Sequence, residues 1–190
     1  YAAPASGIPV REDAPTETEK LYGASKAEAT AALVARATTA TPRLAVARVF
    51  GVYGPGEGPH RLSTMLWNRL SAGQRVPLSA GTQIRDFLHV DDVAGGLLAV
   101  ASSLHETRCP VVANLCSGTA IAVAEFARSF AAAMGADQSL LGFGDLPLRP
   151  DDLAYVVGDP GRLFALTGWR PHFTLAEGLA ETVDFLAQRA

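Results

Sequence analysis

The chain has 190 residues, of which 48% are hydrophobic, and a formal net charge of −3 at pH 7. A chain of this size can bury one sizeable core, so a single soluble globular unit is the first expectation. The near-balanced charge and the lack of a basic run argue against nucleic acid as a partner, and no apolar run approaches the roughly 20 residues of a membrane-spanning helix.

The cysteines and histidines give no sign of a disulfide framework or a metal site. Cys109 and Cys116 lack histidine neighbours at metal-ligand spacing, so we interpret both as ordinary thiols in a reducing cytoplasm. The histidines are scattered without triad or zinc spacing, at His60, His89, His105 and His172. His89 follows a predicted strand, and we interpret it as structural. No metal is expected.

In chain order, residues 1–20 are predicted to form a loop, because prolines and a glycine interrupt every periodic pattern. A helix carrying Tyr22 follows, and the alanine-rich residues 27–37 favour it. Residues 43–50 alternate and include β-branched side chains, which predicts a buried strand. Loop 51–59 would follow the carboxyl end of that strand, where open α/β sheets place ligands.

The rest of the chain is predicted to alternate short strands with helices, which indicates a parallel α/β architecture. We expect helices at 60–70, 93–104, 123–134 and 175–187, strands at 76–78, 84–87 and 111–115, and an irregular segment at 144–150. Asp91 and Asp92 are expected to open the helix that follows them, because carboxylates favour helix N-termini. We prefer this capping role to a metal site.

A tyrosine and a lysine stand four residues apart, at Tyr22 and Lys26, with only Gly, Ala and Ser between them. On a helix this spacing stacks the two side chains on one face, one turn apart. A phenol titrates near roughly 10 in water, and an ammonium within about 4–6 Å lowers the pKa of a phenol. Such a pair can exchange a proton with a substrate hydroxyl near neutral pH.

Further segments accompany this pair along the chain, at residues 48–56, 85–93, 114–118, 149–152 and 168–171. Together with the Tyr-x-x-x-Lys helix they resemble the extended short-chain dehydrogenase/reductases. Within that superfamily they resemble the NAD-dependent epimerase/dehydratase family, which contains nucleotide-sugar epimerases, dehydratases and 4-ketoreductases. The tail, residues 158–171, is most similar to bacterial nucleotide-sugar 4-ketoreductases.

The resemblance implies part of a Rossmann-like, doubly wound parallel sheet and a small C-terminal α/β lobe that binds the substrate. Residues 1–58 would be the C-terminal part of the NAD(P)-binding domain. Residues 59–190 would be mostly the substrate lobe, with segments that return to the Rossmann sheet. The family's glycine-rich turn and its catalytic serine or threonine would lie before position 1. We therefore expect the chain, taken alone, to be inactive and not to bind NAD(P).

The resemblance also implies roles for individual residues. Tyr22 would transfer the proton, Lys26 would bind the nicotinamide ribose, and Phe50 would line the nicotinamide pocket. Tyr22 and Lys26 are thus the expected catalytic residues, and with Phe50 they are the expected ligands of NAD or NADP.

For the substrate, the resemblance points to Gly51, Arg85, Phe87, Arg149 and Asp152. The two arginines would bind phosphate, because a guanidinium presents a planar fork that matches phosphate oxygens. Phe87 would contact the base and Asp152 a ribose hydroxyl. The expected substrate is a nucleotide-diphosphate sugar.

Departures from the family pattern weigh against a standard UDP-galactose epimerase. Gly51 stands where many relatives have an asparagine that binds the substrate phosphates. Val156 stands where galactose epimerases carry a tyrosine. Apart from these two departures, Asp151 stands in place of the glycine of the family's Arg-x-Gly-Asp segment, a difference from which we infer no preference among the activities.

The leading hypothesis is an NAD(P)-dependent enzyme that transfers hydride at C4 of a nucleotide-linked sugar. Epimerase, 4-ketoreductase and dehydratase remain open, as do NAD and NADP. The alternative is a non-catalytic nucleotide-sugar or NAD(P)-binding protein of the same fold, which would not need the Tyr22–Lys26 pair. The family also implies a homodimer, through the helix of Tyr22 and the small-residue helix that contains Gly95 and Gly96. Packing of that helix against the chain's own sheet is equally consistent with its small residues.

Overall fold

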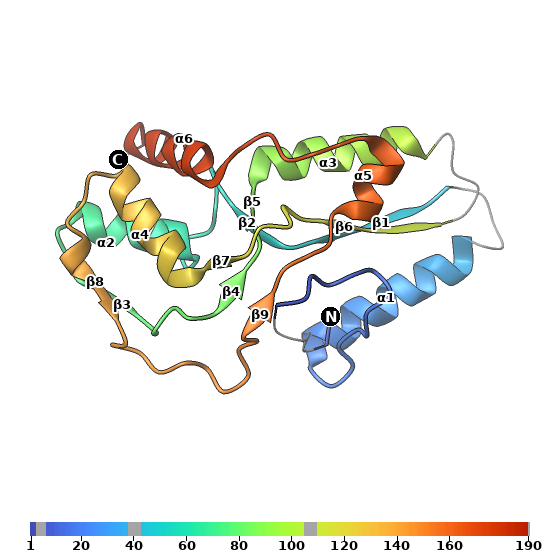
Figure 1. Ribbon diagram of the computed structural model, residues 1–190, viewed down its shortest axis with the longest axis horizontal. Helices are drawn as coiled ribbons and strands as arrows, with labels where there is room; N and C mark the ends of the chain where they lie inside the picture. Colours follow the sequence, from blue (N-terminus) through green and yellow to red (C-terminus); the bar gives the residue numbers. More distant parts are fainter. Residues whose placement is uncertain (3–6, 38–42, 105–109, 190) are drawn as a thin grey trace.

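The structure, a computed structural model, describes residues 1–2, 7–37, 43–104 and 110–189. His105 and Cys109 lie outside the described residues. The elements fall into two groups at opposite ends of the molecule's long axis (Figure 1). Each group surrounds its own hydrophobic cluster, and short strands between the two ends connect them.

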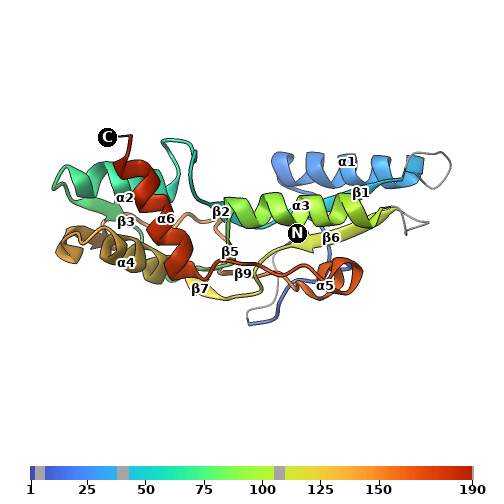
Figure 2. The same ribbon diagram turned by 90° about the horizontal axis from the view of Figure 1, so that it is seen from above.

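At one end, β1 (Ala45–Val49) pairs in parallel with β6 (Val111–Leu115). Helices α3 (Val90–Ser103) and α5 (Gly161–Thr167) pack on this pair, and α1 (Leu21–Ala37) lies on the other side of β1 (Figures 1 and 2). The core under α3 and α5 consists of Leu88, Val100, Ala113, Leu115 and Leu163.

At the other end, three amphipathic helices pack beside the parallel pair of β3 (Val76–Leu78) and β8 (Leu141–Phe143). The helices are α2 (Leu62–Ser71), α4 (Val123–Ala133) and α6 (Leu175–Ala187). Phe126 and Phe130 of α4 are fully buried, and they form the centre of this larger core.

Short strands join the two ends. Strand β2 (Gly51–Tyr53) pairs in parallel with β5 (Phe87–His89), and β4 (Ile84–Arg85) pairs in parallel with β9 (Tyr155–Val156). Strand β7 (Ile121–Ala122) is antiparallel to β4, and the 3-10 helix η1 (Gln138–Leu140) precedes β8. The parallel pairs confirm the expected parallel α/β architecture. None of the described helices is both long and apolar enough to cross a membrane.

The predicted start of the third helix is wrong. Helix α3 begins at Val90, and its N-cap is His89, whose Nδ1 accepts a hydrogen bond from the backbone of Asp91 at 3.4 Å. Asp92 does not cap the helix. Its carboxylate is buried and accepts hydrogen bonds from the backbone N–H groups of His172 (2.7 Å) and Phe173 (3.1 Å). Asp92 therefore ties the C-terminal segment to α3, and the structural interpretation of His89 is confirmed.

The small residues of α3 allow close packing within the chain. A Cβ atom on Gly96 would collide with the buried side chain of Leu115 and would lie 3.3 Å from the indole ring of Trp169. At Gly95 the nearest atom, Nε1 of Trp169, would lie 3.4 Å away. Trp169 therefore packs over α3, and Gly96 serves the chain's own core.

Candidate active site

Helix α1 carries Tyr22 and Lys26 on one face, as the spacing predicts. The ammonium nitrogen of Lys26 lies 5.5 Å from the centre of the Tyr22 ring. Tyr22 is 77% exposed, and no residue of α1 is buried. Both side chains line a cavity of about 770 Å³ beside β1. The phenol and the ammonium can therefore both reach a ligand in this cavity.

The start of α1 is held by Glu17. Its Oε1 accepts hydrogen bonds from the backbone N–H groups of Glu19 (2.8 Å) and Lys20 (3.4 Å), and the bond from Glu19 is the main cause of a pKa below the ordinary value. The Glu17 side chain passes so close to Gly23 that a Cβ there would overlap it. The small residue next to Tyr22 is thus required by the packing of this turn.

The end of β1 forms another wall of the cavity, at Phe50 and Gly51. The backbone N–H of Gly51 donates to the carbonyl oxygen of Asp86 at 3.0 Å. A Cβ on Gly51 would lie 2.6 Å from that same oxygen, closer than packed atoms can approach. Strand β2 can therefore offer a ligand only backbone at Gly51, and a longer side chain there would force β2 away from β5.

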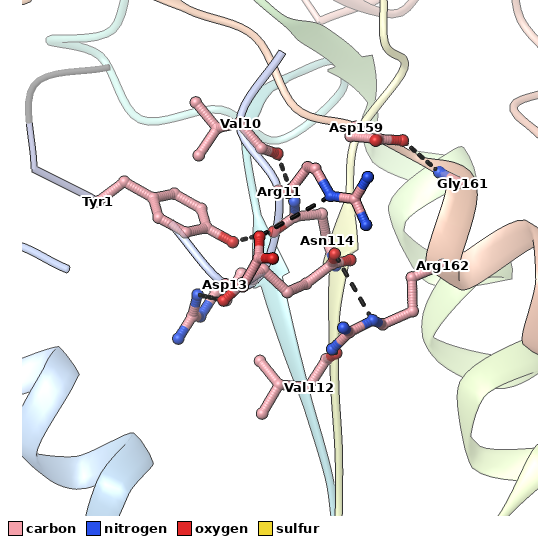
Figure 3. A network of polar contacts seen from close by, with 11 residues as sticks. Tyr1, Val10, Arg11, Asp13, Val112, Asn114, Asp159, Gly161 and Arg162 are labelled. Carbon is pink, nitrogen blue, oxygen red and sulfur yellow. Dashed lines mark hydrogen bonds and ion pairs between the residues drawn. The ribbon is translucent and has the colours of Figure 1, made fainter. Parts of the chain in front are cut away.

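A polar network fixes the segment before α1 against the end of β6 (Figure 3). The hydroxyl of Tyr1 donates to Oδ1 of Asn114, whose Nδ2 donates to the carbonyl of Val10 at 2.8 Å. The backbone N–H of Asn114 donates to the carboxylate of Glu12 at 2.8 Å, and Arg162 lies 3.6 Å from the same carboxylate. The network holds Tyr1, which also lines the cavity, and burial raises the pKa of its phenol.

Asp86, between β4 and β5, is a buried carboxylate that the sequence analysis did not single out. It accepts hydrogen bonds from the N–H and hydroxyl of Ser117 (2.8 and 2.7 Å) and from the N–H groups of Gly118 (2.9 Å) and Gly158 (3.2 Å). Burial raises the pKa of Asp86, against the lowering effect of these bonds. Asp86, which lines the 770 Å³ cavity, thus joins the segment after β6 to the segment after β9.

Arg85 lines the same cavity and forms an ion pair with Asp152. Asp152 also accepts a hydrogen bond from Nε2 of Gln83 at 2.7 Å. One Nη1–H of Arg85 donates to the carbonyl of Ile84 at 2.8 Å, which fixes one edge of the guanidinium. The predicted phosphate-binding and ribose-binding residues are thus direct neighbours.

The structure brings together at this cavity five of the expected site residues, Tyr22, Lys26, Phe50, Gly51 and Arg85. Asp152 joins them through its ion pair with Arg85.

Phe87 and Arg149 lie elsewhere. Phe87 stacks on Phe126 with ring centres 4.2 Å apart and lines a second cavity of about 680 Å³. Arg149 is exposed and does not line either cavity.

One group of metal-ligand residues occurs among the described parts of the chain, namely His89, Asp91 and Glu181. Nδ1 of His89 accepts a hydrogen bond from Asp91, so the proton of the neutral imidazole belongs on Nε2, which lies 3.4 Å from the carboxylate of Glu181. That imidazole has no free lone pair for a cation. The group is better explained as a helix cap with a neighbouring carboxylate.

Comparisons with known proteins identify relatives of the chain. A model of the NAD dependent epimerase/dehydratase family matches residues 1–116. A dTDP-L-rhamnose 4-epimerase from Burkholderia thailandensis is 30% identical over 173 aligned residues, which cover 88% of this chain and 46% of that protein. A dTDP-glucose 4,6-dehydratase from Streptomyces griseus is 32% identical, with coverages of 90% and 51%.

Among solved structures, MoeE5 in complex with UDP-glucose and NAD is 27% identical and superposes with a TM-score of 0.87. The alignment covers 98% of this chain and 62% of that chain. The chain spans about half the length of the curated relatives it matches.

Proposed function

Because the chain belongs to the NAD-dependent epimerase/dehydratase family, we propose that it forms part of an enzyme that transfers hydride at C4 of a nucleotide-linked sugar. The observation that carries this proposal is the Tyr22–Lys26 pair, which lies on one helix face and opens into the 770 Å³ cavity. The named relatives support a dTDP- or UDP-linked sugar.

The residues at the cavity fit a nicotinamide nucleotide. Phe50 offers an aromatic wall and Lys26 a hydrogen-bond donor for a ribose hydroxyl, and the volume admits a nicotinamide with its ribose. When bound, NAD or NADP supplies the acceptor or donor of the hydride. Lys26 and Phe50 would hold that ribose and ring within reach of Tyr22.

Tyr22 performs the proton transfer. In the oxidation direction its phenolate oxygen removes the proton of the C4 hydroxyl while C4 loses a hydride, so the product is a 4-keto sugar. In the reduction direction the phenol returns that proton to the alkoxide oxygen. The Lys26 ammonium, 5.5 Å from the ring centre, stabilises the negative charge that the phenolate carries.

We assign the substrate diphosphate to Arg85 and the nucleotide ribose to Asp152, which are paired beside the cavity. Gly51 would offer its backbone to the substrate. Phe87 and Arg149 stay predictions as base and phosphate ligands, because their side chains lie outside the lining of the Tyr22 cavity. The division at residue 58 also stays a prediction. This division is supported by the positions of α3, β6 and α5, which come after residue 58 in the sequence but pack at the end of the molecule that holds β1.

We also propose a homodimer through α1 and α3. Leu97 and Leu98 of α3 are 45% and 70% exposed. Burying such side chains against a second copy would remove apolar surface from water. A cytoplasmic location stays a prediction, which the free and buried Cys116 thiol supports.

The test is turnover of dTDP-4-keto-6-deoxyglucose with NADPH, and of dTDP-glucose and UDP-glucose with NAD, by the protein that contains this chain. Replacing Tyr22 by Phe removes the proton-transfer group and should lower kcat about 10²- to 10⁴-fold. Tyr155→Phe is the matched control, because Tyr155 lines neither cavity, and its rate should not change. Equal rates for the protein and its Tyr22→Phe variant would overturn the mechanism. Ligand binding without any turnover would favour the non-catalytic alternative.

A further inference from the structure

We propose that Lys20 is a further ligand of the substrate diphosphate and forms a two-cation site with Arg85 at the 770 Å³ cavity. In the structure both cations are paired with consecutive carboxylates, Lys20 with Asp151 and Arg85 with Asp152. The diphosphate would take the place of Asp151. This inference rests on the nucleoside-diphosphate substrate of the proposed function.

Lys20 lies two residues before Tyr22, at the turn that opens α1, and it lines the same cavity as Tyr22 and Arg85. The contacts of its ammonium group go to one residue. Nζ donates to the carbonyl oxygen of Asp151 at 2.9 Å and lies 3.5 Å from the Asp151 carboxylate. The ammonium group therefore already binds oxygen atoms, one of which belongs to a carboxylate.

Lys20 and Arg85 contact two consecutive residues, Asp151 and Asp152, and both cations line the same cavity. A diphosphate carries two anionic phosphate groups joined by a shared oxygen, so a single ligand in the cavity can present one phosphate to each cation. A diphosphate is therefore a ligand that suits this pair of cations.

The two ion pairs differ in how easily they open. The side chains of Lys20 and Asp151 are 49% and 69% exposed, and exposed pairs contribute little to stability. Arg85 and Asp152 are more enclosed, at 22% and 29%, and Gln83 also binds Asp152. We therefore expect Asp151 to leave and Asp152 to remain. Arg85 keeps N–H donors for phosphate, because a guanidinium has five and the contacts to Ile84 and Asp152 use only part of them.

A role of Lys20 in binding diphosphate and a purely structural role of the Lys20–Asp151 contact predict opposite effects of the same substitution. If Asp151 competes with the diphosphate for Lys20, neutralising its carboxylate should strengthen diphosphate binding. If the Lys20–Asp151 contact only holds the loop in a binding-competent position, the same change should weaken binding. The sign of the effect of Asp151→Asn therefore separates the two explanations.

The experiment is calorimetric titration of the chain with inorganic pyrophosphate at low salt. Pyrophosphate probes the cations without a base or sugar. We expect Lys20→Met, which keeps the aliphatic stem, to weaken binding about tenfold. Asp151→Asn should tighten binding about threefold or more. Asp145→Asn is the matched control, because Asp145 pairs with exposed Arg75 outside both cavities, and it should leave the affinity unchanged.

Absence of pyrophosphate binding to the unmodified chain would overturn the two-cation site. So would an unchanged affinity of Lys20→Met, or weaker binding by Asp151→Asn. These outcomes are independent of the turnover test on Tyr22. If pyrophosphate does not bind but turnover is observed, the two-cation site is wrong and the proposed function stands. If pyrophosphate binds as expected but no turnover is observed, the anion site stands and the proposed enzymatic function is wrong.

Discussion

At the scale of single residues, the carboxylate of Asp86 is almost completely buried, and both of its oxygens accept hydrogen bonds from other residues. Its exposure is 1%, and its two oxygens accept four hydrogen bonds from three residues of two other segments. Oδ1 receives both bonds from Ser117, and Oδ2 receives those from Gly118 and Gly158. Only an acceptor at both positions satisfies all of these donors.

Asp86→Asn should therefore destabilise the protein by about 2–4 kcal/mol, because the amide NH₂ would face donors that it cannot satisfy. Urea unfolding measures this difference. Since burial raises the pKa of Asp86, the folded state takes up a proton more readily than the unfolded chain does. This residue therefore adds stability as the pH falls through its folded pKa toward the ordinary value.

Asparagine does not titrate, so the stability gap between the two proteins should widen as the pH is lowered from about 7 toward about 4. The same pH series on both proteins cancels the contributions of the other carboxylates. A gap that narrows instead would mean that the four hydrogen bonds outweigh the effect of burial on the Asp86 pKa.

The residue pattern predicted local relationships but not distant ones. Tyr22 and Lys26 could be placed on one face from their spacing alone, because the helix repeat is a property of a few neighbouring residues. The bond between Tyr1 and Asn114 joins residues 113 positions apart, and the bonds of Asp86 reach at least 31 positions along the chain. Sequence patterns carry no direct signal for such partners.

At the scale of elements, the packing of α3 requires glycine at position 96 but not at position 95. Gly96→Ala adds a methyl group against buried Leu115 and the Trp169 ring, and overpacking of this kind costs about 1–3 kcal/mol. The gain in helix propensity from Gly to Ala, about 1 kcal/mol, offsets part of it. We expect Gly96→Ala to lower the free energy of unfolding by about 1 kcal/mol.

Gly95→Ala is the control for that substitution, because the helix propensity gain is the same while the nearest atom is 3.4 Å away. It should be neutral or stabilising by up to about 1 kcal/mol in the same denaturation assay. Equal effects of the two substitutions would contradict the packing of Leu115 and Trp169 against α3.

Long periodic elements were predictable, and among the short ones β3 lies at Val76–Leu78 as predicted, while several others were missed. The last helix lies at Leu175–Ala187, as predicted, because its apolar residues repeat over three turns. Strand β2 was missed inside a segment predicted as loop, and β7 and β9 have only two residues each. Such strands have no period of their own and form by pairing with distant strands. Helix α5 escaped prediction because it spans only seven residues before Gly168, which ends it in a left-handed conformation.

For the molecule as a whole, the proposed dimer gives a direct prediction. Leu98→Glu places a charge on the exposed face of α3 and should shift a dimer toward monomer, raising the dissociation constant at least tenfold. Sedimentation velocity over a concentration series measures this. Leu146→Glu is the control, because Leu146 is 48% exposed but lies outside α1 and α3. An unchanged sedimentation profile for Leu98→Glu would remove α3 from the interface.

No side chain of α1 is buried by the other described residues of this chain. Isolated helices of about 17 residues are only marginally formed in water. Contacts made to the uncovered surface of α1 would therefore stabilise the helix, and by doing so they would hold Tyr22 and Lys26 in their common orientation.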